Sequence, residues 1–290
     1  MTVLRDLYRT RPHSRPRNEA SFECSQQGRV TDLTLLNREA GEVHRPTSED
    51  AQRAMASRFD ETLFLADWVD AVFLHFEVEA EKLQPDVPFE LDDFNGRCFV
   101  SLVAFTMRDM RLSVGGRLTR WLTAPLANQR FLNLRTYVRH GRETGIFFMR
   151  EWLDNPLAVR LGPVTFGLPY EKAKLDYDHD GLCPTGRVET RNGVLAYGGG
   201  KEGDAAPAMK GTVDEFLFER YTAFTNAGRR QKFFRVWHPP WELTELTEVT
   251  LEENSLFDGL GMPWVETARL VSVHHTFGVH DVWMSRPHRV

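Results

Sequence analysis

Residues 131–138 read FLNLRTYV and decide the predicted fold. Every second side chain is polar, from Asn133 through Arg135 to Tyr137, and the side chains between them are mostly apolar. A period of two is typical of a strand with one polar and one apolar face. An arginine between an asparagine and a tyrosine on one strand face suits an anion, because guanidinium binds carboxylate through paired hydrogen bonds. The stretch therefore predicts a strand and a candidate anion site.

Further strand patterns follow on both sides of this stretch, separated by glycine, proline and asparagine. Asn192-Gly193 between two alternating runs predicts a β-hairpin. Many strands with few helices favour a curved sheet or barrel, a mainly β (α+β) fold, over an alternating α/β fold. The predicted strands are residues 89–93, 97–109, 131–139, 145–153, 157–161, 164–168, 174–178, 186–190, 193–198, 233–238, 244–249 and 268–275.

A few short helices are predicted around these strands. The segment 63–73, LFLADWVDAVF, places apolar side chains at helical spacing and predicts a short helix. Residues 212–221 predict another helix, because Thr212 and Glu215 have the spacing of a capping box. Residues 255–260 predict a third, short helical turn.

Composition excludes several classes of protein. The 290 residues carry a formal net charge of −5, which argues against a nucleic-acid-binding protein. No apolar run reaches the roughly 20 residues of a membrane helix, so no membrane partner is expected. The three cysteines, Cys24, Cys98 and Cys183, are widely spaced and form no CxxC pair, which suits a reducing cytoplasm. A homo-oligomer is compatible with the sequence, which does not specify the number of subunits.

Neither a metal site nor a cofactor is predicted. His274, His275 and His280 form the one histidine cluster, and adjacent histidines on a strand point to opposite faces. They therefore lack the geometry of a shared zinc site.

The N-terminal segment differs from the rest of the chain. Residues 1–56 are polar and weakly periodic, and the first 17 contain five arginines and one acidic residue. This predicts a basic tail that either wraps the domain or is partly disordered. Residues 57–290 are predicted to form the barrel domain.

Six motifs occur in the order found in one protein family. They are FNGRCFVSLVAFTMRDMR, FLNLRTYV, TGIFF, FGLPYEKAKL, FLFERYTAFT and HPPWEL. Together they resemble the YqjF-like family of uncharacterised proteins, which looks like a branch of the acetoacetate decarboxylase-like superfamily. The resemblance covers about Phe64 to Trp283. It implies a closed, cone-shaped β-barrel with a central cavity and a few peripheral helices, whose interior would accept the polar face of 131–138.

The resemblance also implies a change in chemistry. Acetoacetate decarboxylases form a Schiff base through a lysine whose pKa a neighbouring lysine lowers. The matching turn here, residues 167–169, is followed by Tyr170 and Glu171 in place of the lysine pair. Lys172 and Lys174 stand at shifted positions, and Lys172 shares its strand parity with Tyr170. Lys172 would therefore reach a cavity, and could form a Schiff base, only if Tyr170 did too. We favour the alternative that both lysines face solvent and that the Schiff-base lysine is missing.

Several residues are candidates for the site. Arg135 is the strongest, and the alternative for it is an internal salt bridge, for example to Glu219. Tyr170 and Glu171 could act as hydrogen-bond donor and base, and His238, held in HPPWEL, could act as acid or base. The predicted ligand-binding residues are Asn133, Arg135, Tyr137, Tyr170, Glu219 and Trp241; the candidate catalytic residues are Tyr170, Glu171 and His238.

Three functions are compatible with this sequence. The first is a barrel that binds a small organic molecule, an anion such as a carboxylate, in its cavity. The second is a lyase or hydrolase that uses Glu171, Tyr170 or His238. The third is a structural or partner-binding module in which Arg135 satisfies an internal carboxylate.

Overall fold

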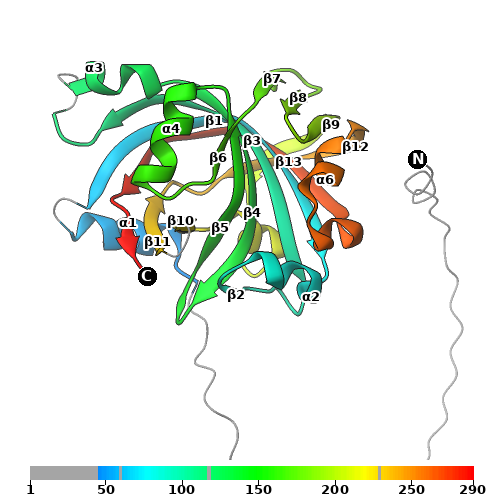
Figure 1. Ribbon diagram of the computed structural model, residues 1–290, viewed down its shortest axis with the longest axis horizontal. Coiled ribbons are helices and arrows are strands. Elements are labelled where there is room, and N and C mark those ends of the chain that lie inside the picture. The colour runs from blue at the N-terminus through cyan, green and yellow to red at the C-terminus, as the bar shows by residue number, and fades with distance from the viewer. Residues whose placement is uncertain (1–44, 59–60, 116–118, 228–229) are drawn as a thin grey trace, which may run out of the picture. The chain divides into compact units, whose positions relative to one another are not determined.

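The computed structural model describes residues 45–58, 61–115, 119–227 and 230–290, and within them the chain is mainly β (Figure 1). Predictions for residues 1–44 lie outside the described residues. The strands are β1 Thr62–Val78, β2 Glu90–Leu91, β3 Cys98–Leu112, β4 Gln129–His140, β5 Glu143–Leu153, β6 Tyr170–Lys172, β7 Lys174–Asp178, β8 Thr185–Thr190, β9 Gly193–Pro207, β10 Thr222–Ala227, β11 Arg230–Trp237, β12 Glu242–Glu253, β13 Arg269–Ser285 and β14 His288–Arg289. The α-helices are α1 Ser48–Ala56, α2 Ala80–Leu83, α3 Arg120–Thr123, α4 Pro156–Thr165, α5 Val213–Phe218 and α6 Ser255–Leu260. The 3-10 helices are η1 Gln84–Asp86, η3 Ala124–Leu126 and η4 Pro263–Thr267.

Seven strands close into a barrel in the order β11-β10-β5-β4-β3-β1-β13. The ring closes where β13 pairs with β11, with Val236 opposite Met284 and Trp237 opposite Trp283. Strands β12, β9, β8 and β7 continue the sheet beyond β13. The predicted mainly β, closed barrel with a few peripheral helices is confirmed, and so is the hairpin at Asn192-Gly193, which joins β8 to β9.

The segment 63–73 is a strand, so the predicted helix there is wrong. It lies within β1, which pairs with β13 on one side and β3 on the other. Both faces of β1 are buried: Val72 and Leu74 belong to one hydrophobic cluster and Phe73 to another. A strand buried on both faces loses the alternation of polar and apolar residues by which strands are usually recognised.

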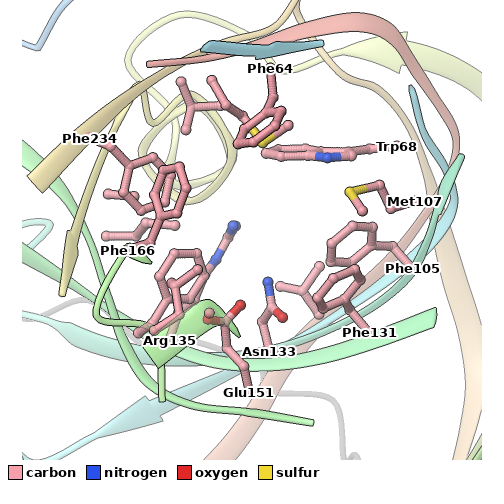
Figure 2. A pocket seen from close by; sticks show the side chains of 18 of the residues that line it. Phe64, Trp68, Phe105, Met107, Phe131, Asn133, Arg135, Glu151, Phe166 and Phe234 are labelled. Carbon is pink, nitrogen blue, oxygen red and sulfur yellow. The ribbon is translucent and has the colours of Figure 1, made fainter. Parts of the chain in front are cut away.

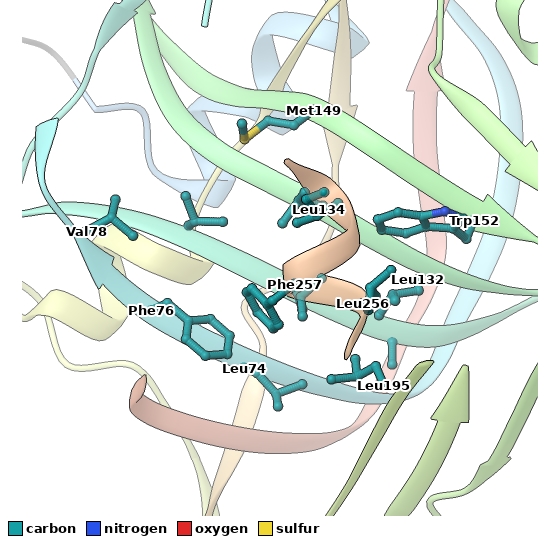
Figure 3. Packing of buried hydrophobic residues seen from close by; sticks show 14 of the residues in the cluster. Leu74, Phe76, Val78, Leu132, Leu134, Met149, Trp152, Leu195, Leu256 and Phe257 are labelled. Atoms are coloured by element: carbon teal, nitrogen blue, oxygen red, sulfur yellow. The ribbon is translucent and has the colours of Figure 1, made fainter. Parts of the chain in front are cut away.

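The two clusters are an inner core inside the barrel and an outer core on its outer surface. The outer core packs barrel residues such as Leu132, Leu134 and Trp152 against Leu256 and Phe257 of α6 (Figure 3). Since even-numbered side chains of β4 fill this outer core, its odd-numbered side chains point inward.

Residues 156–165 form helix α4, so the strands predicted at 157–161 and 164–168 are wrong. The Asn155 side chain caps the helix by accepting hydrogen bonds from the backbone N–H groups of Leu157 (3.0 Å) and Ala158 (3.3 Å). Gly162 lets the helix approach β6, because a Cβ there would lie 2.2 Å from the Tyr170 ring.

The other two predicted helices are present as α5 and α6. Thr212 caps α5 by accepting a hydrogen bond from the backbone N–H of Glu215 at 3.3 Å. Among the described helices, none combines the length and apolar content needed to cross a bilayer.

Helix α1 occupies the last part of the segment predicted as a tail. It lies next to β11 (Figure 1), and its Ser48 hydroxyl donates to the His238 carbonyl at 2.7 Å. Met55 and Ala51 of this helix are buried. The domain boundary at residue 56 stays a prediction.

Candidate functional site

A cavity of about 350 Å³ lies inside the barrel. Aromatic and aliphatic side chains form most of its wall, among them Phe64, Trp68 and Phe234 (Figure 2). Its volume is within the range of small-molecule sites, which are mostly apolar with a few placed polar groups.

Four polar residues of the cavity lining come from three neighbouring strands. Asn133 and Arg135 of β4, Glu151 of β5 and Tyr170 of β6 all line it. The strand register explains why they meet: Asn133 is opposite Glu151, and Glu151 is opposite Tyr170. Side chains opposite each other on paired strands are direct neighbours, and Figure 2 shows Asn133, Arg135 and Glu151 on one side of the cavity.

Arg135 points into this cavity as predicted, and it forms no ion pair within 4.0 Å with any carboxylate of the described chain. Its guanidinium donates a long hydrogen bond to the Leu217 carbonyl (3.4 Å) and lies 5.5 Å from the centre of the Phe73 ring. Its Nε is buried without a hydrogen-bond partner. The guanidinium therefore keeps hydrogen-bonding capacity for a ligand.

Glu219, the alternative partner of Arg135, is engaged elsewhere. Its carboxylate accepts hydrogen bonds from the Tyr221 hydroxyl and from the backbone N–H of Trp241 (3.3 Å). Burial raises the pKa of this carboxyl above its ordinary value. Glu219 is not among the cavity-lining residues, so its predicted ligand contact stays a prediction.

Glu151 is the cavity residue that the sequence did not single out. It is 3% exposed, and its Oε2 has no hydrogen-bond partner. Burial raises its pKa well above the ordinary value of a glutamate. We expect a neutral carboxyl that can donate a hydrogen bond. The available signal was a glutamate in an otherwise apolar strand pattern, MREWL, but its neighbours depend on the register.

Tyr170 and Glu171, which stand in place of the lysine pair, lie on β6 after helix α4 and point in different directions. Tyr170 lines the cavity, and burial, with the Glu151 carboxyl nearby, raises its pKa well above the ordinary value. Glu171 faces away and pairs with Arg150 (2.5 Å) and Arg191 (3.4 Å). A role for Glu171 as a base inside the cavity therefore does not fit this geometry.

Both shifted lysines lie at the surface. Lys172 is exposed, and Lys174 is 3.6 Å from Glu189 across the β7–β8 pair. No lysine occurs among the described residues that line the cavity.

His238 and Trp241 line the inner wall near Trp68. The His238 Nδ1–H donates to the Pro239 carbonyl at 2.8 Å, and burial lowers the pKa of this histidine to about 4. The imidazole is therefore neutral at physiological pH. Trp241 stacks on Trp68 with ring centres 6.4 Å apart.

Tyr137 is fully buried but does not line the cavity. Its hydroxyl donates to the Leu217 carbonyl at 3.2 Å and lies 2.7 Å from the Ser101 hydroxyl, which in turn is 2.7 Å from Nδ1 of His75. This chain of buried polar contacts gives Tyr137 a structural role here. Its predicted ligand contact stays a prediction.

A second arginine of the cavity lining, Arg220, is buried and already has an ion-pair partner. Arg220 pairs with Asp92 at 2.7 Å, and Arg45 binds the same carboxylate at 2.9 Å. The sequence did not distinguish Arg220 from its neighbour Glu219. Among the described residues, His, Cys, Asp and Glu form no group of three suited to a metal ion.

The fold and cavity define an acetoacetate decarboxylase-like β-barrel protein. The acetoacetate decarboxylase of Legionella pneumophila subsp. pneumophila str. Philadelphia 1 is similar, with 15% identity, a TM-score of 0.54 and coverage of 78% of this chain and 87% of that one. The enduracididine biosynthesis enzyme MppR, solved with pyruvate, has 11% identity and a TM-score of 0.56, covering 80% of this chain and 91% of MppR. At these identities the likeness shows the fold.

The chain belongs to DUF2071, a family of uncharacterized conserved proteins whose model matches residues 65–279. It is also 29% identical to the uncharacterized protein YqjF of Bacillus subtilis (strain 168) over 211 residues, which cover 70% of this chain and 84% of YqjF. The family resemblance expected from the motifs is confirmed.

Proposed function

We propose that this protein binds a small organic anion, a carboxylate, in the barrel cavity at Arg135. One observation carries this function: a guanidinium without an ion-pair partner among the described residues lies in a cavity that is otherwise mostly apolar. Arg135 is half-buried, and a charge that is partly removed from water is less costly when it is paired, so a ligand carboxylate would compensate it.

The fold relatives support this kind of ligand. MppR, which shares the fold, was solved with pyruvate bound, and pyruvate is a small carboxylate. Since no lysine lines the described part of this cavity, binding would not proceed to a Schiff base.

Intrinsic fluorescence can test the binding, because Trp68 and Trp241 line the cavity. We expect one or more acids from a panel of pyruvate, acetoacetate, propanoate, hexanoate and benzoate to change the emission in a saturable way. The Arg135→Met variant should bind about 10- to 100-fold more weakly, the usual effect of losing a hydrogen bond to a charged group. Arg187→Met, at an exposed position of β8, is the matched control. Absence of binding, or equal binding by Arg135→Met, would overturn the proposal.

An enzyme of lyase or hydrolase type is the second candidate, favoured by the two neutral groups Tyr170 and His238 at the cavity wall. Borohydride treatment with acetoacetate separates this route from the Schiff-base route, and we expect no adduct on Lys172 or Lys174. An Arg135→Ala variant that fails to fold would favour the third, structural role. The cytoplasmic location and a homo-oligomer stay proposals.

A further inference from the structure

We propose that the ligand is an amphiphilic monocarboxylic acid, with its carboxylate at Arg135 and an apolar chain or ring that extends toward the barrel mouth. This inference rests on the proposed function and narrows its ligand class. It follows from where the charged and apolar groups lie along the cavity.

Arg135 lies deep in the cavity. Along β4 the lining residues are Gln129, Phe131, Asn133 and Arg135, and a strand rises about 3.3 Å per residue, so the cavity side of this strand extends over about 20 Å. Beyond Arg135 the inner end is walled by buried residues, including Phe218 and Trp241 at 2% and 5% exposure.

The opposite end of the cavity opens to solvent, and its lining is mostly apolar apart from Gln129 and Thr165. Four elements line this end: the start of β1, the end of β3, the 3-10 helix η3 and the helix α4. Helix α4 packs against η3. Leu161 of α4 is 39% exposed. The other partly exposed apolar residues at this end are Leu63, Phe64, Met110 and Leu126.

The cavity has a place for one carboxylate. Arg220 is already neutralised by Asp92, which leaves Arg135 as the one cationic lining residue without an ion pair in the described chain. A second carboxylate on the ligand would meet the apolar side chains of the mouth, where burying a charge is unfavourable. A dicarboxylate therefore fits this site poorly.

Groups beside Arg135 complete the recognition of the carboxylate. Oε2 of Glu151 and Nε of Arg135 are buried without hydrogen-bond partners. The amide nitrogen of Asn133 points into the cavity in Figure 2. Because burial keeps the Glu151 carboxyl protonated, it would donate a hydrogen bond to the ligand instead of repelling it.

Calorimetric titration of the full chain tests the ligand class with butanoate, hexanoate, octanoate and decanoate. Each buried methylene group should tighten binding about fourfold until the chain passes the mouth. Suberate, a dicarboxylate as long as octanoate, and octanol, which lacks the charge, should each bind more than about tenfold more weakly than octanoate.

A pair of variants on α4 tests the direction of the chain. Leu161→Ser should weaken decanoate binding severalfold and leave butanoate unchanged, since only the longer acid reaches Leu161. Leu157→Ser is the matched control, because Leu157 is 42% exposed on the same helix and does not line the cavity.

The outcomes separate this inference from the proposed function. If no acid binds, the proposed function fails, and the inference fails with it. If short acids bind through Arg135 but longer acids bind no tighter, or suberate matches octanoate, anion binding stands and the amphiphilic ligand is wrong. An equal effect of Leu161→Ser on butanoate and decanoate would also contradict the proposed direction of the chain.

Discussion

Replacing Glu151 by glutamine should change how the stability of the protein depends on pH. Glu151 is 3% exposed, and burial raises its pKa well above the ordinary value of 4.5. Between that value and the folded-state pKa, the folded protein binds one proton that the unfolded chain has released. The free energy of unfolding therefore falls as pH rises, by about 1.4 kcal/mol per pH unit from this one group.

Glutamine has nearly the same shape and does not titrate. Relative to wild type, Glu151→Gln should gain stability with rising pH, by up to about 2.7 kcal/mol between pH 5 and pH 7. The gain ends where Glu151 ionises in the folded wild-type protein, since above that pH both states have released the proton. The same substitution should preserve carboxylate binding at neutral pH, because glutamine also offers a hydrogen-bond donor.

Urea unfolding followed by tryptophan fluorescence at several pH values measures this difference. Glu252→Gln, at an exposed position of β12, controls for the removal of one carboxyl. If the stability curves of wild type and Glu151→Gln run parallel from pH 5 to pH 7, the carboxyl is ionised in the folded protein. The cavity would then carry one positive and one negative group and would suit a zwitterion better than a simple anion.

Three further predictions concern packing and charge. Asp92→Asn should lower the free energy of unfolding by about 3–5 kcal/mol, measured by urea denaturation, because it leaves the Arg220 charge buried without compensation. Gly162→Ala should lower the melting temperature, although alanine favours helices, because its Cβ would lie 2.2 Å from the Tyr170 ring and overpacking costs about 1–3 kcal/mol. The wild-type protein should lose stability as pH falls from 6.5 toward 4, by up to about 1.4 kcal/mol per pH unit from His238 alone. In this range the unfolded chain takes up a proton on His238, whereas the folded protein does not, because burial lowers the pKa of His238 to about 4. The variant His238→Asn should show a smaller loss of stability per pH unit.

Each of these predictions has a control elsewhere in the barrel. Glu77→Gln removes surface ion pairs and should cost less than about 1 kcal/mol, so an equal cost for Asp92→Asn would contradict the buried-charge argument. Gly200→Ala meets no atom within 4 Å, and an effect as large as that of Gly162→Ala would mean that the Tyr170 contact is not the cause. An unchanged acid slope in His238→Asn, with exposed His140→Asn as reference, would assign the acid sensitivity to other groups.

Sequence reasoning predicted correctly those strands that have one polar and one apolar face. In β4, Asn133 and Arg135 face the cavity and Leu132, Leu134 and Val138 face the outer core, so the period of two is visible in the sequence. In β1 both faces are buried, and apolar residues on each face produced an apparent helical spacing. Helix α4 contains two prolines, a glycine and β-branched residues, which are unfavourable in helices, so the sequence did not predict it. The helix depends on the Asn155 cap and on the close contact of Gly162 with β6.

The candidate site was predictable to the extent that it depends on strand parity. Parity placed Asn133 and Arg135 on one strand face, whereas the sequence left both Tyr170 and Glu171 as candidates, and the structure places Tyr170 at the cavity. Glu151 was missed because its position opposite both Asn133 and Tyr170 requires the register of three strands. A single sequence does not reveal that register, since β6 reaches β5 only after the chain passes through α4.

The presence of an arginine and the absence of a lysine in the described lining of this cavity have a direct chemical consequence. A lysine amine can lose its proton in a buried site and attack a ketone, whereas a guanidinium stays protonated and cannot form a Schiff base. Here the one cationic lining residue without an ion pair, within the described chain, is Arg135, and burial raises the pKa values of its neighbours Glu151 and Tyr170, which favours their neutral forms. Such a set can donate hydrogen bonds to a carboxylate, but none of the three side chains is an amine that could attack a ketone. Under the proposed function, the cavity would hold an anion without forming a covalent bond to it.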